Sequence, residues 1–186
     1  MNIAFDKRLT VDEFLVWAET QPREAGRFEL LDGVVIVQQS QQFGHAKLKL
    51  RAAIALMEAI ERAGVPFFAV GEGPTVRINA RKAFEPDALV AALPEPALDS
   101  IEIPNPTIVV EVLSPSTARI DATIKLKGYF EVDSIQHYLI VDPEGKVIVH
   151  HRRAASGSVE SVVVDSGDLI LDPPGLTISM LELFGS

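Results

Sequence analysis

The sequence of 186 residues contains no cysteine. The absence of thiols excludes disulfide bridges and zinc sites with thiolate ligands. No uninterrupted apolar run reaches the roughly 20 residues that a membrane-spanning helix needs, and no apolar block follows the charges near the amino terminus. We therefore expect a cytoplasmic protein that has neither a membrane span nor a secretory signal.

The chain also lacks an excess of basic residues. Its 17 lysines and arginines face 26 aspartates and glutamates, which gives a formal net charge of −9. A protein that binds a phosphate backbone by charge alone is basic, so this balance counts against broad binding of nucleic acid. It is compatible with a local carboxylate site that recruits divalent cations. Composition alone leaves nucleic-acid chemistry open.

The order of apolar patterns indicates a single α/β domain, residues 1–186, with a mixed β-sheet flanked by helices. A hydrophobic content of 47% suffices for one sizeable core but not for two comfortable domains. Thr10 and Glu13 form a capping-box pattern before an amphipathic helix. Asp32-Gly33 between two β-rich runs predicts a hairpin, and apolar spacing predicts a helix over 45–63 that ends at Gly64. Further strands are expected at 65–70, 75–78, 88–92, 107–113, 137–141, 147–152, 159–164 and 169–171, with a surface loop at 94–106 and a helix that ends near 131.

Two carboxylates are prominent because of their strand context. Glu111 interrupts the β-branched run 107–113, and burying such a charge is costly unless a metal ion or a cation compensates it. Asp87 follows Pro86 at the start of the preceding strand. Hard oxygen ligands on adjacent strands suit magnesium, with water and substrate phosphate completing the coordination. The alternatives are a Glu111–lysine pair and an ordinary Pro-Asp turn.

The helix expected before residue 131 carries a third group. Asp121, Lys125 and Tyr129 are each four residues apart, which places them roughly on one helical face. The alternative is a solvated Asp-Lys pair on the surface. Glu29 is a further candidate acid, in the strand before Asp32-Gly33, and its alternative is a solvent-facing position in an alternating strand.

The four histidines offer a competing metal site. His150 and His151 are neighbours in a strand, so their side chains point to opposite faces and do not easily bind one ion. We interpret both as structural or surface residues. His45 opens a helix, where it either caps the helix or lines the site.

Taken together, these blocks resemble the Uma-type restriction endonuclease family, a bacterial group within the PD-(D/E)xK nuclease superfamily. The resemblance covers nearly the whole chain. It is carried, in order, by Phe28-Glu29-Leu30-Leu31-Asp32-Gly33, His45, Glu85-Pro86-Asp87, Val110-Glu111-Val112-Leu113-Ser114-Pro115-Ser116-Thr117, Asp121-x-x-x-Lys125-x-x-x-Tyr129 and Tyr138-Leu139-Ile140-Val141-Asp142-Pro143.

The resemblance implies a restriction endonuclease-like fold whose active site lies where two strands of the sheet diverge. By position, Asp87, Glu111 and the backbone carbonyl of Val112 would bind Mg²⁺, or Mn²⁺ in its place. Glu29 would be an additional acid beside the metal. These residues, together with a lysine, would form the catalytic centre.

The lysine departs from the usual pattern of the superfamily. It normally follows the second acid after one intervening residue, and that position here is Leu113. Lys125 on the following helix is then the natural substitute. Lys127 is the fallback, but its side chain points well away from Lys125 on a helix.

The expected activity is metal-dependent hydrolysis of phosphodiester bonds in nucleic acid, with DNA as the expected substrate. The alternative is a catalytically inactive binding or regulatory protein on the same scaffold, which the negative charge and the displaced lysine favour. A hydrolase of small phosphate esters has less support, because Gly71-Glu72-Gly73-Pro74 is a turn and not a phosphate-cradling loop. The apolar strand 159–164 offers an edge for a second copy, so we expect a homodimer.

Overall fold

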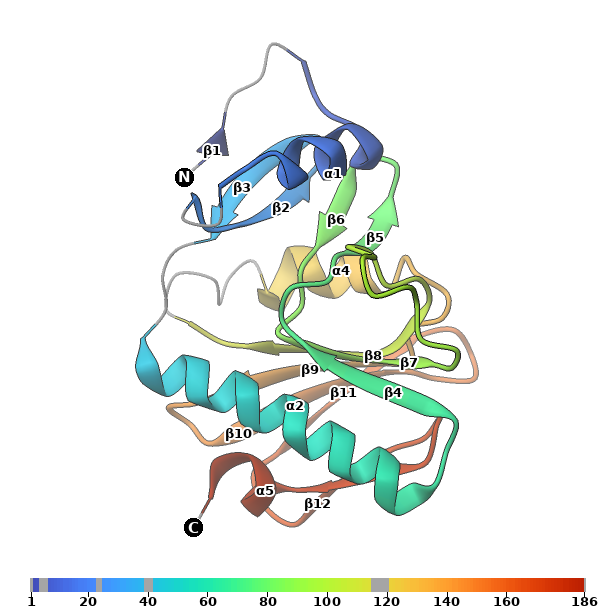
Figure 1. The fold of residues 1–186 in the computed structure, drawn as a ribbon. Helices are drawn as coiled ribbons and strands as arrows, with labels where there is room; N and C mark the ends of the chain where they lie inside the picture. The colour runs from blue at the N-terminus through green and yellow to red at the C-terminus, as the bar shows by residue number, and fades with distance from the viewer. Residues whose placement is uncertain (1, 4–6, 23–24, 39–41, 115–120, 186) are drawn as a thin grey trace.

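The computed structural model of the chain describes residues 2–3, 7–22, 25–38, 42–114 and 121–185 (Figure 1). Its helices are α1 (Val11–Glu19), α2 (Phe43–Ala63), the π-helix η2 (Asp121–Lys125), α4 (Leu126–Tyr129) and α5 (Met180–Phe184). Its strands are β1 (Asn2–Ile3), β2 (Arg27–Leu31), β3 (Val34–Gln38), β4 (Phe67–Gly71), β5 (Val76–Asn79), β6 (Lys82–Phe84), β7 (Ala88–Ala92), β8 (Pro106–Val112), β9 (His137–Asp142), β10 (Val147–Arg153), β11 (Val159–Val164), β12 (Asp168–Leu171) and β13 (Leu176–Ser179). Within these ranges no helix combines the length and the apolar character that crossing a membrane requires.

Local sequence signals shape the first elements as expected. Thr10 caps α1 in a capping box with Glu13. Asp32 and Gly33 both have positive φ, 50° and 80°, which is the backbone that the tight turn between β2 and β3 requires. Gly64 ends α2 in the left-handed conformation at φ 63°. These three predictions are confirmed.

The main sheet has the strand order β11-β10-β9-β8-β7-β4. β8 and β9 run parallel, and the other neighbouring pairs are antiparallel, so the sheet is mixed. Parallel neighbours need a crossover connection, and the connection from β8 to β9 contains η2 and α4. The prediction of a mixed sheet flanked by helices is confirmed, and the crossover carries Lys125 and Tyr129 over one face of the sheet.

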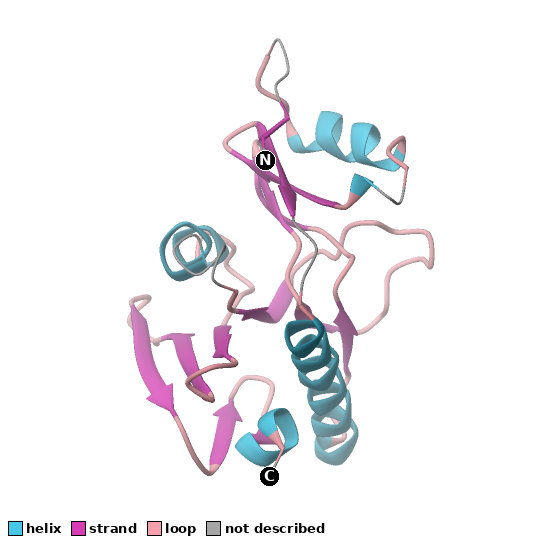
Figure 2. Cartoon of the chain, turned by 90° about the vertical axis from the view of Figure 1, so that its left-hand side faces the viewer, coloured by secondary structure: helices cyan, strands magenta, loops and turns pink. Residues whose placement is uncertain are grey.

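Helices cover both faces of the main sheet (Figures 1 and 2). α2 packs with β13 and α5 on the face that presents Val110 and Val112. α4 lies on the opposite face, where Tyr129 packs with Val109. Because successive strand residues point to opposite faces, Glu111 shares the face of Val109 and points towards α4.

A second sheet, with the order β1-β3-β2-β6-β5, lies above the main sheet in Figure 1 and packs against α1. The sequence patterns do not predict β6, which is three residues long and joins β2 through the pairing of Leu30 with Ala83. This pairing places Glu29 of β2 beside the segment that leads from β6 to Asp87. The two sheets therefore meet at the candidate site.

Candidate active site

Asp87 and Glu111 lie close together because β7 pairs with β8. The register joins Ala88 to Val110, so the residue just before β7 faces the end of β8. The Asp87 amide donates to the Val110 carbonyl at 2.9 Å, and the Val112 amide donates to Oδ2 of Asp87 at 2.7 Å. Both acids are only 4% exposed. The structure therefore brings the two predicted acids together in a buried position.

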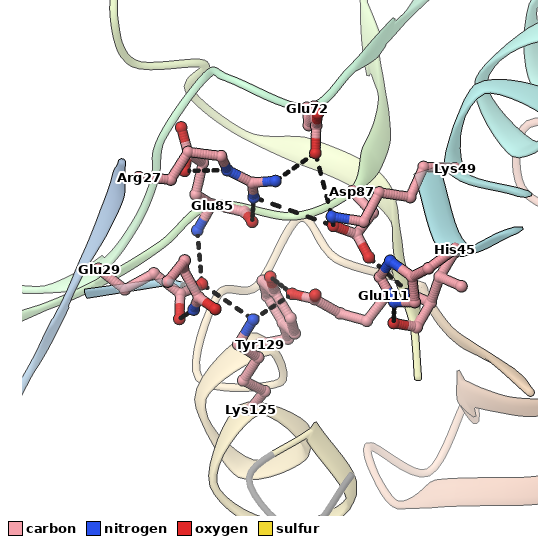
Figure 3. Close-up of polar contacts among 12 residues, drawn as sticks. Arg27, Glu29, His45, Lys49, Glu72, Glu85, Asp87, Glu111, Lys125 and Tyr129 are labelled. Atoms are coloured by element: carbon pink, nitrogen blue, oxygen red, sulfur yellow. Dashed lines mark hydrogen bonds and ion pairs between the residues drawn. The ribbon is translucent and has the colours of Figure 1, made fainter. Parts of the chain in front are cut away.

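Glu111 is held from the crossover helix. Lys125 Nζ and the Tyr129 hydroxyl both donate to Oε1 of Glu111, at 2.7 Å and 2.6 Å, and one helical turn separates the two donors (Figure 3). Burial raises the pKa of Tyr129 well above its usual value, and the charge of Glu111 adds to this effect, so the phenol stays a donor at neutral pH. Lys127, the fallback lysine, is exposed. The side chain of Asp121 lies outside the described part of the chain.

Lys125 also joins Glu111 to Glu29. Its Nζ lies 2.9 Å from Oε1 of Glu29. The same acid accepts from the Glu85 amide at 3.0 Å and from Nε2 of Gln38 at 2.6 Å. Because Glu29 is 4% exposed, the solvent-facing alternative for this residue is wrong. The surface-pair alternative for Lys125 is also wrong, since Lys125 is buried between two acids.

Two cations that the sequence patterns do not identify complete the cluster. Nζ of Lys49, a buried residue of α2, lies 2.5 Å from Oδ1 of Asp87 and 3.0 Å from Oε2 of Glu72. Arg27 of β2 contacts Glu72 as well, and its Nε lies 2.7 Å from Oε2 of Glu85 (Figure 3). Each of the two central acids therefore has a lysine of its own, from a different helical segment.

Sequence spacing offers a signal for only one of these cations. His45 and Lys49 are four residues apart on α2, so they share a helical face, and this spacing could have placed Lys49 beside the site. Arg27 has no such local signal, because the pairing of distant strands positions it. Leu113, at the usual position of the lysine, packs instead against an apolar cluster of the core.

The surroundings of the two outer acids, Glu72 and Glu85, shift their pKa values in opposite directions. Burial would raise the pKa of Glu72, but the hydrogen bond from Lys49 and the charge of Arg27 outweigh it and hold that pKa below its ordinary value. For Glu85, burial outweighs the attraction of Arg27 and raises the pKa. Glu72 therefore keeps its negative charge at neutral pH.

A small cavity lies among these side chains. Its volume is about 20 Å³, and Asp87, Glu111, Val112 and Lys125 are among the residues that line it. Such a volume has room for about one water-sized group. His45 lines the cavity too, with Nε2 at 2.5 Å from the carbonyl oxygen of Val112. Of the two alternatives for His45, the structure therefore supports the position at the site.

The other three histidines belong to the core of the fold. His137 Nε2 donates to the Pro173 carbonyl at 2.9 Å, so Nδ1 of the neutral ring accepts from His150 Nε2 at 2.9 Å. His151 contacts the Ser161 hydroxyl at 2.6 Å. Burial lowers the pKa of all three rings, that of His150 to about 4. These contacts agree with the interpretation of His150 and His151 as structural residues.

Comparison with known proteins places the chain in a family. The model of the Uma2 family, described as "Putative restriction endonuclease", matches residues 11–182. The chain belongs to the Uma2 family. Its fold is similar, with a TM-score of 0.70, to a crystal structure of "a putative nuclease belonging to DUF820" from Anabaena variabilis ATCC 29413, which is 19% identical over 95% of this chain and 97% of that one. The comparison with curated proteins gave no match.

The Uma2 match and the fold confirm the resemblance seen in the sequence. The family match indicates a nuclease of the restriction endonuclease-like type, and the similar structure shows the fold. A family of this type implies a divalent metal ion.

The donor set of this Uma2 member fits a hard divalent cation. Asp87, Glu111 and the Val112 carbonyl offer oxygen atoms around one small cavity. Among the described residues, no three His, Asp or Glu side chains form a metal site by themselves. An ion would therefore keep water and substrate oxygens as its remaining ligands, as magnesium does in phosphate chemistry. The cluster also contains two more acids than cations, which matches the charge of a divalent ion. Its acids are Glu29, Glu72, Glu85, Asp87 and Glu111, and its cations are Arg27, Lys49 and Lys125.

Proposed function

We propose that the chain is a metal-dependent endonuclease that hydrolyses phosphodiester bonds in DNA. Asp87, Glu111 and the carbonyl of Val112 bind Mg²⁺, for which Mn²⁺ can substitute. The observation that carries this proposal is the convergence of the two buried acids, the Val112 backbone and Lys125 on one cavity of about 20 Å³. Asp87 starts β7, Glu111 and Val112 end β8, and Lys125 ends η2, so this convergence depends on the whole fold.

In this proposal each side chain of the site has a distinct role. When bound, the metal ion lowers the pKa of a water molecule and polarises the scissile phosphate. Lys125, whose Nζ is held between Glu111 and Glu29, orients the attacking water or stabilises the charge that develops in the transition state. Tyr129 fixes the Glu111 carboxylate through its hydrogen bond. Glu29 acts mainly by holding Lys125, because its two oxygens already accept from Lys125, Glu85 and Gln38.

The net negative charge of the protein opposes the binding of nucleic acid. At a net charge of −9 the chain repels a phosphate backbone as a whole, so the bound cation supplies much of the local attraction.

We also propose a homodimer that forms through β11. This strand is an edge of the main sheet, and its Val162 and Val163 are exposed.

The activity is tested with purified protein, supercoiled plasmid DNA and a single-stranded RNA of similar length. We expect cleavage of the plasmid with Mg²⁺ or Mn²⁺ and none with EDTA. Glu111→Gln and Asp87→Asn should lose about 100-fold or more of the rate, because several kcal/mol of transition-state stabilisation depend on the metal. Glu61→Gln, the same chemical change at an exposed position of α2, is the control and should cleave like the wild type. Cleavage that survives in Glu111→Gln would refute the proposal, and cleavage of RNA alone would correct its substrate.

One observation favours a second candidate, a binding or regulatory protein that does not cleave. Both central acids already have a buried lysine partner, so their charges are compensated without a metal ion. For such a protein, Mn²⁺ binding that depends on Asp87 would occur without cleavage of either nucleic acid. The plasmid assay and a Mn²⁺ titration on the same preparation separate the two functions.

A further inference from the structure

Lys49 is a buried cation without a role in the proposed chemistry. It comes from the second turn of α2 and is 4% exposed. Burial of a lysine is costly unless acids compensate its charge. Lys49 has two such acids, with Nζ at 2.5 Å from Asp87 and at 3.0 Å from Glu72. It therefore bridges a proposed metal ligand and an acid that has no place among the ligands.

The two acids that hold Lys49 differ greatly in exposure. The side chain of Asp87 is 5% exposed, whereas that of Glu72 is 47% exposed and lies in the turn between β4 and β5. Burial raises the pKa of Glu72, but the hydrogen bond from Lys49 and the charge of Arg27 lower it further than burial raises it. The acid is therefore negative at neutral pH. Glu72 thus offers Lys49 a charged partner that is already in contact and lies nearer to solvent.

Lys125 is held by two buried acids (Figure 3). It lies between Glu111 and Glu29, and both of these side chains are only 5% exposed. If a divalent ion takes the place of Lys125 at Glu111, the ion pair of Lys125 with the buried Glu29 remains. A lysine displaced from Asp87 can instead move onto Glu72. The two lysines therefore differ in the exposure of the acids that hold them.

We infer that Lys49 is a positioning residue that controls the access of the divalent cation to Asp87. Without metal, Lys49 occupies the Oδ1 atom of Asp87. When the ion binds, Lys49 gives up this contact and keeps its ion pair with Glu72, so that no buried charge is left without a partner. This inference rests on the proposed function, because it assumes that Asp87 is a metal ligand.

The test is a titration of the purified chain with Mn²⁺ alone, in which free Mn²⁺ is measured by electron paramagnetic resonance. Lys49→Met removes the competing charge and should lower the dissociation constant by about tenfold or more. Glu72→Gln leaves Lys49 without its outer acid and should raise the dissociation constant by about tenfold. Lys49→Arg keeps the charge and should stay within about threefold of the wild type.

A double variant separates this exchange from simple electrostatics. If Glu72 acted only through its own negative charge, Glu72→Gln would weaken Mn²⁺ binding equally with and without Lys49. Exchange predicts that the effect of Glu72→Gln falls to less than about twofold in the Lys49→Met background. Lys47→Met and Glu61→Gln, at exposed positions of the same helix, are the matched controls and should bind like the wild type.

The outcomes separate this inference from the proposed function. If neither the wild type nor Lys49→Met binds Mn²⁺, both are overturned. If the wild type binds and Lys49→Met, folded by circular dichroism, binds equally or more weakly, only the role of Lys49 is overturned. If Lys49→Met does not fold, the Mn²⁺ affinity of Glu72→Gln tests the exchange by itself, because Glu72 is half exposed and its substitution leaves the core intact. An unchanged dissociation constant in this variant overturns the exchange.

Discussion

The hydrogen bond from Tyr129 to Glu111 contributes measurably to the stability of the fold. Tyr129→Phe removes only the hydroxyl, because the ring keeps its contacts with Phe84 and Tyr138, whose centroids lie 5.3 Å and 5.0 Å away. The acceptor is a buried carboxylate, and a hydrogen bond to a charged group contributes about 1.5–3 kcal/mol. We therefore expect the substitution to lower the free energy of unfolding by about 2 kcal/mol, and Tm by roughly 4–8 °C in a chain of this length.

Urea denaturation followed by circular dichroism measures this loss, and a double-mutant cycle shows its origin. In the Glu111→Gln background the acceptor is neutral, so Tyr129→Phe should cost about 1 kcal/mol or less. Phe84 and Tyr138 pack against the ring in both backgrounds, so their contribution cancels. An equal cost in both backgrounds would refute the reasoning that the hydroxyl stabilises the charge of Glu111.

Other parts of the chain lead to three further expectations. Burial, together with the nearby His137, lowers the pKa of His150 from 6.5 to about 4. As the pH falls from 6.5 to 4, the unfolded chain therefore takes up this proton before the folded chain does. The free energy of unfolding falls over this range, by about 3 kcal/mol at most. Urea denaturation at pH 7 and pH 4.5 should show a smaller fall for His150→Gln, and an equal fall would contradict this origin. A Cβ on Gly128 would lie 2.6 Å from the Phe84 ring, so Gly128→Ala should cost about 1–3 kcal/mol, and an unchanged Tm would contradict the close packing of α4. Val163→Lys on the exposed edge of β11 should give the mass of a monomer in light scattering where the wild type gives that of a dimer, and a monomeric wild type would contradict the proposed homodimer.

The sequence could predict the parts of the fold and site that short-range patterns encode. The Asp32-Gly33 turn and the Gly64 cap each depend on one or two residues that adopt positive φ. Glu111 was recognisable because a carboxylate in an apolar, β-branched strand needs compensation, and Asp87 because it follows Pro86 at the start of the preceding strand. The structure shows that lysines provide this compensation, so burial alone does not distinguish a metal ligand from an ion pair.

The sequence could not predict the contacts that depend on distant pairings. Glu29 lies in an alternating strand, and only the short strand β6, which the patterns do not reveal, buries it beside Glu85. The spacing from His45 indicates only the helical face of Lys49, and its burial follows from the position of α2 against the sheet. Glu72 sits in a turn that local chemistry explains fully, so its contact with Lys49 has no local signal.

A crystal of the protein soaked in Mn²⁺, with data collected at a wavelength where manganese scatters anomalously, tests the central claim most directly. The proposed site predicts one anomalous peak at roughly 2.0–2.4 Å from oxygens of Asp87, Glu111 and the Val112 carbonyl, and no peak in crystals of Asp87→Asn. Manganese bound elsewhere, with Lys49 and Lys125 still paired to the two acids at saturating concentration, would contradict the assignment of Asp87 and Glu111 as metal ligands.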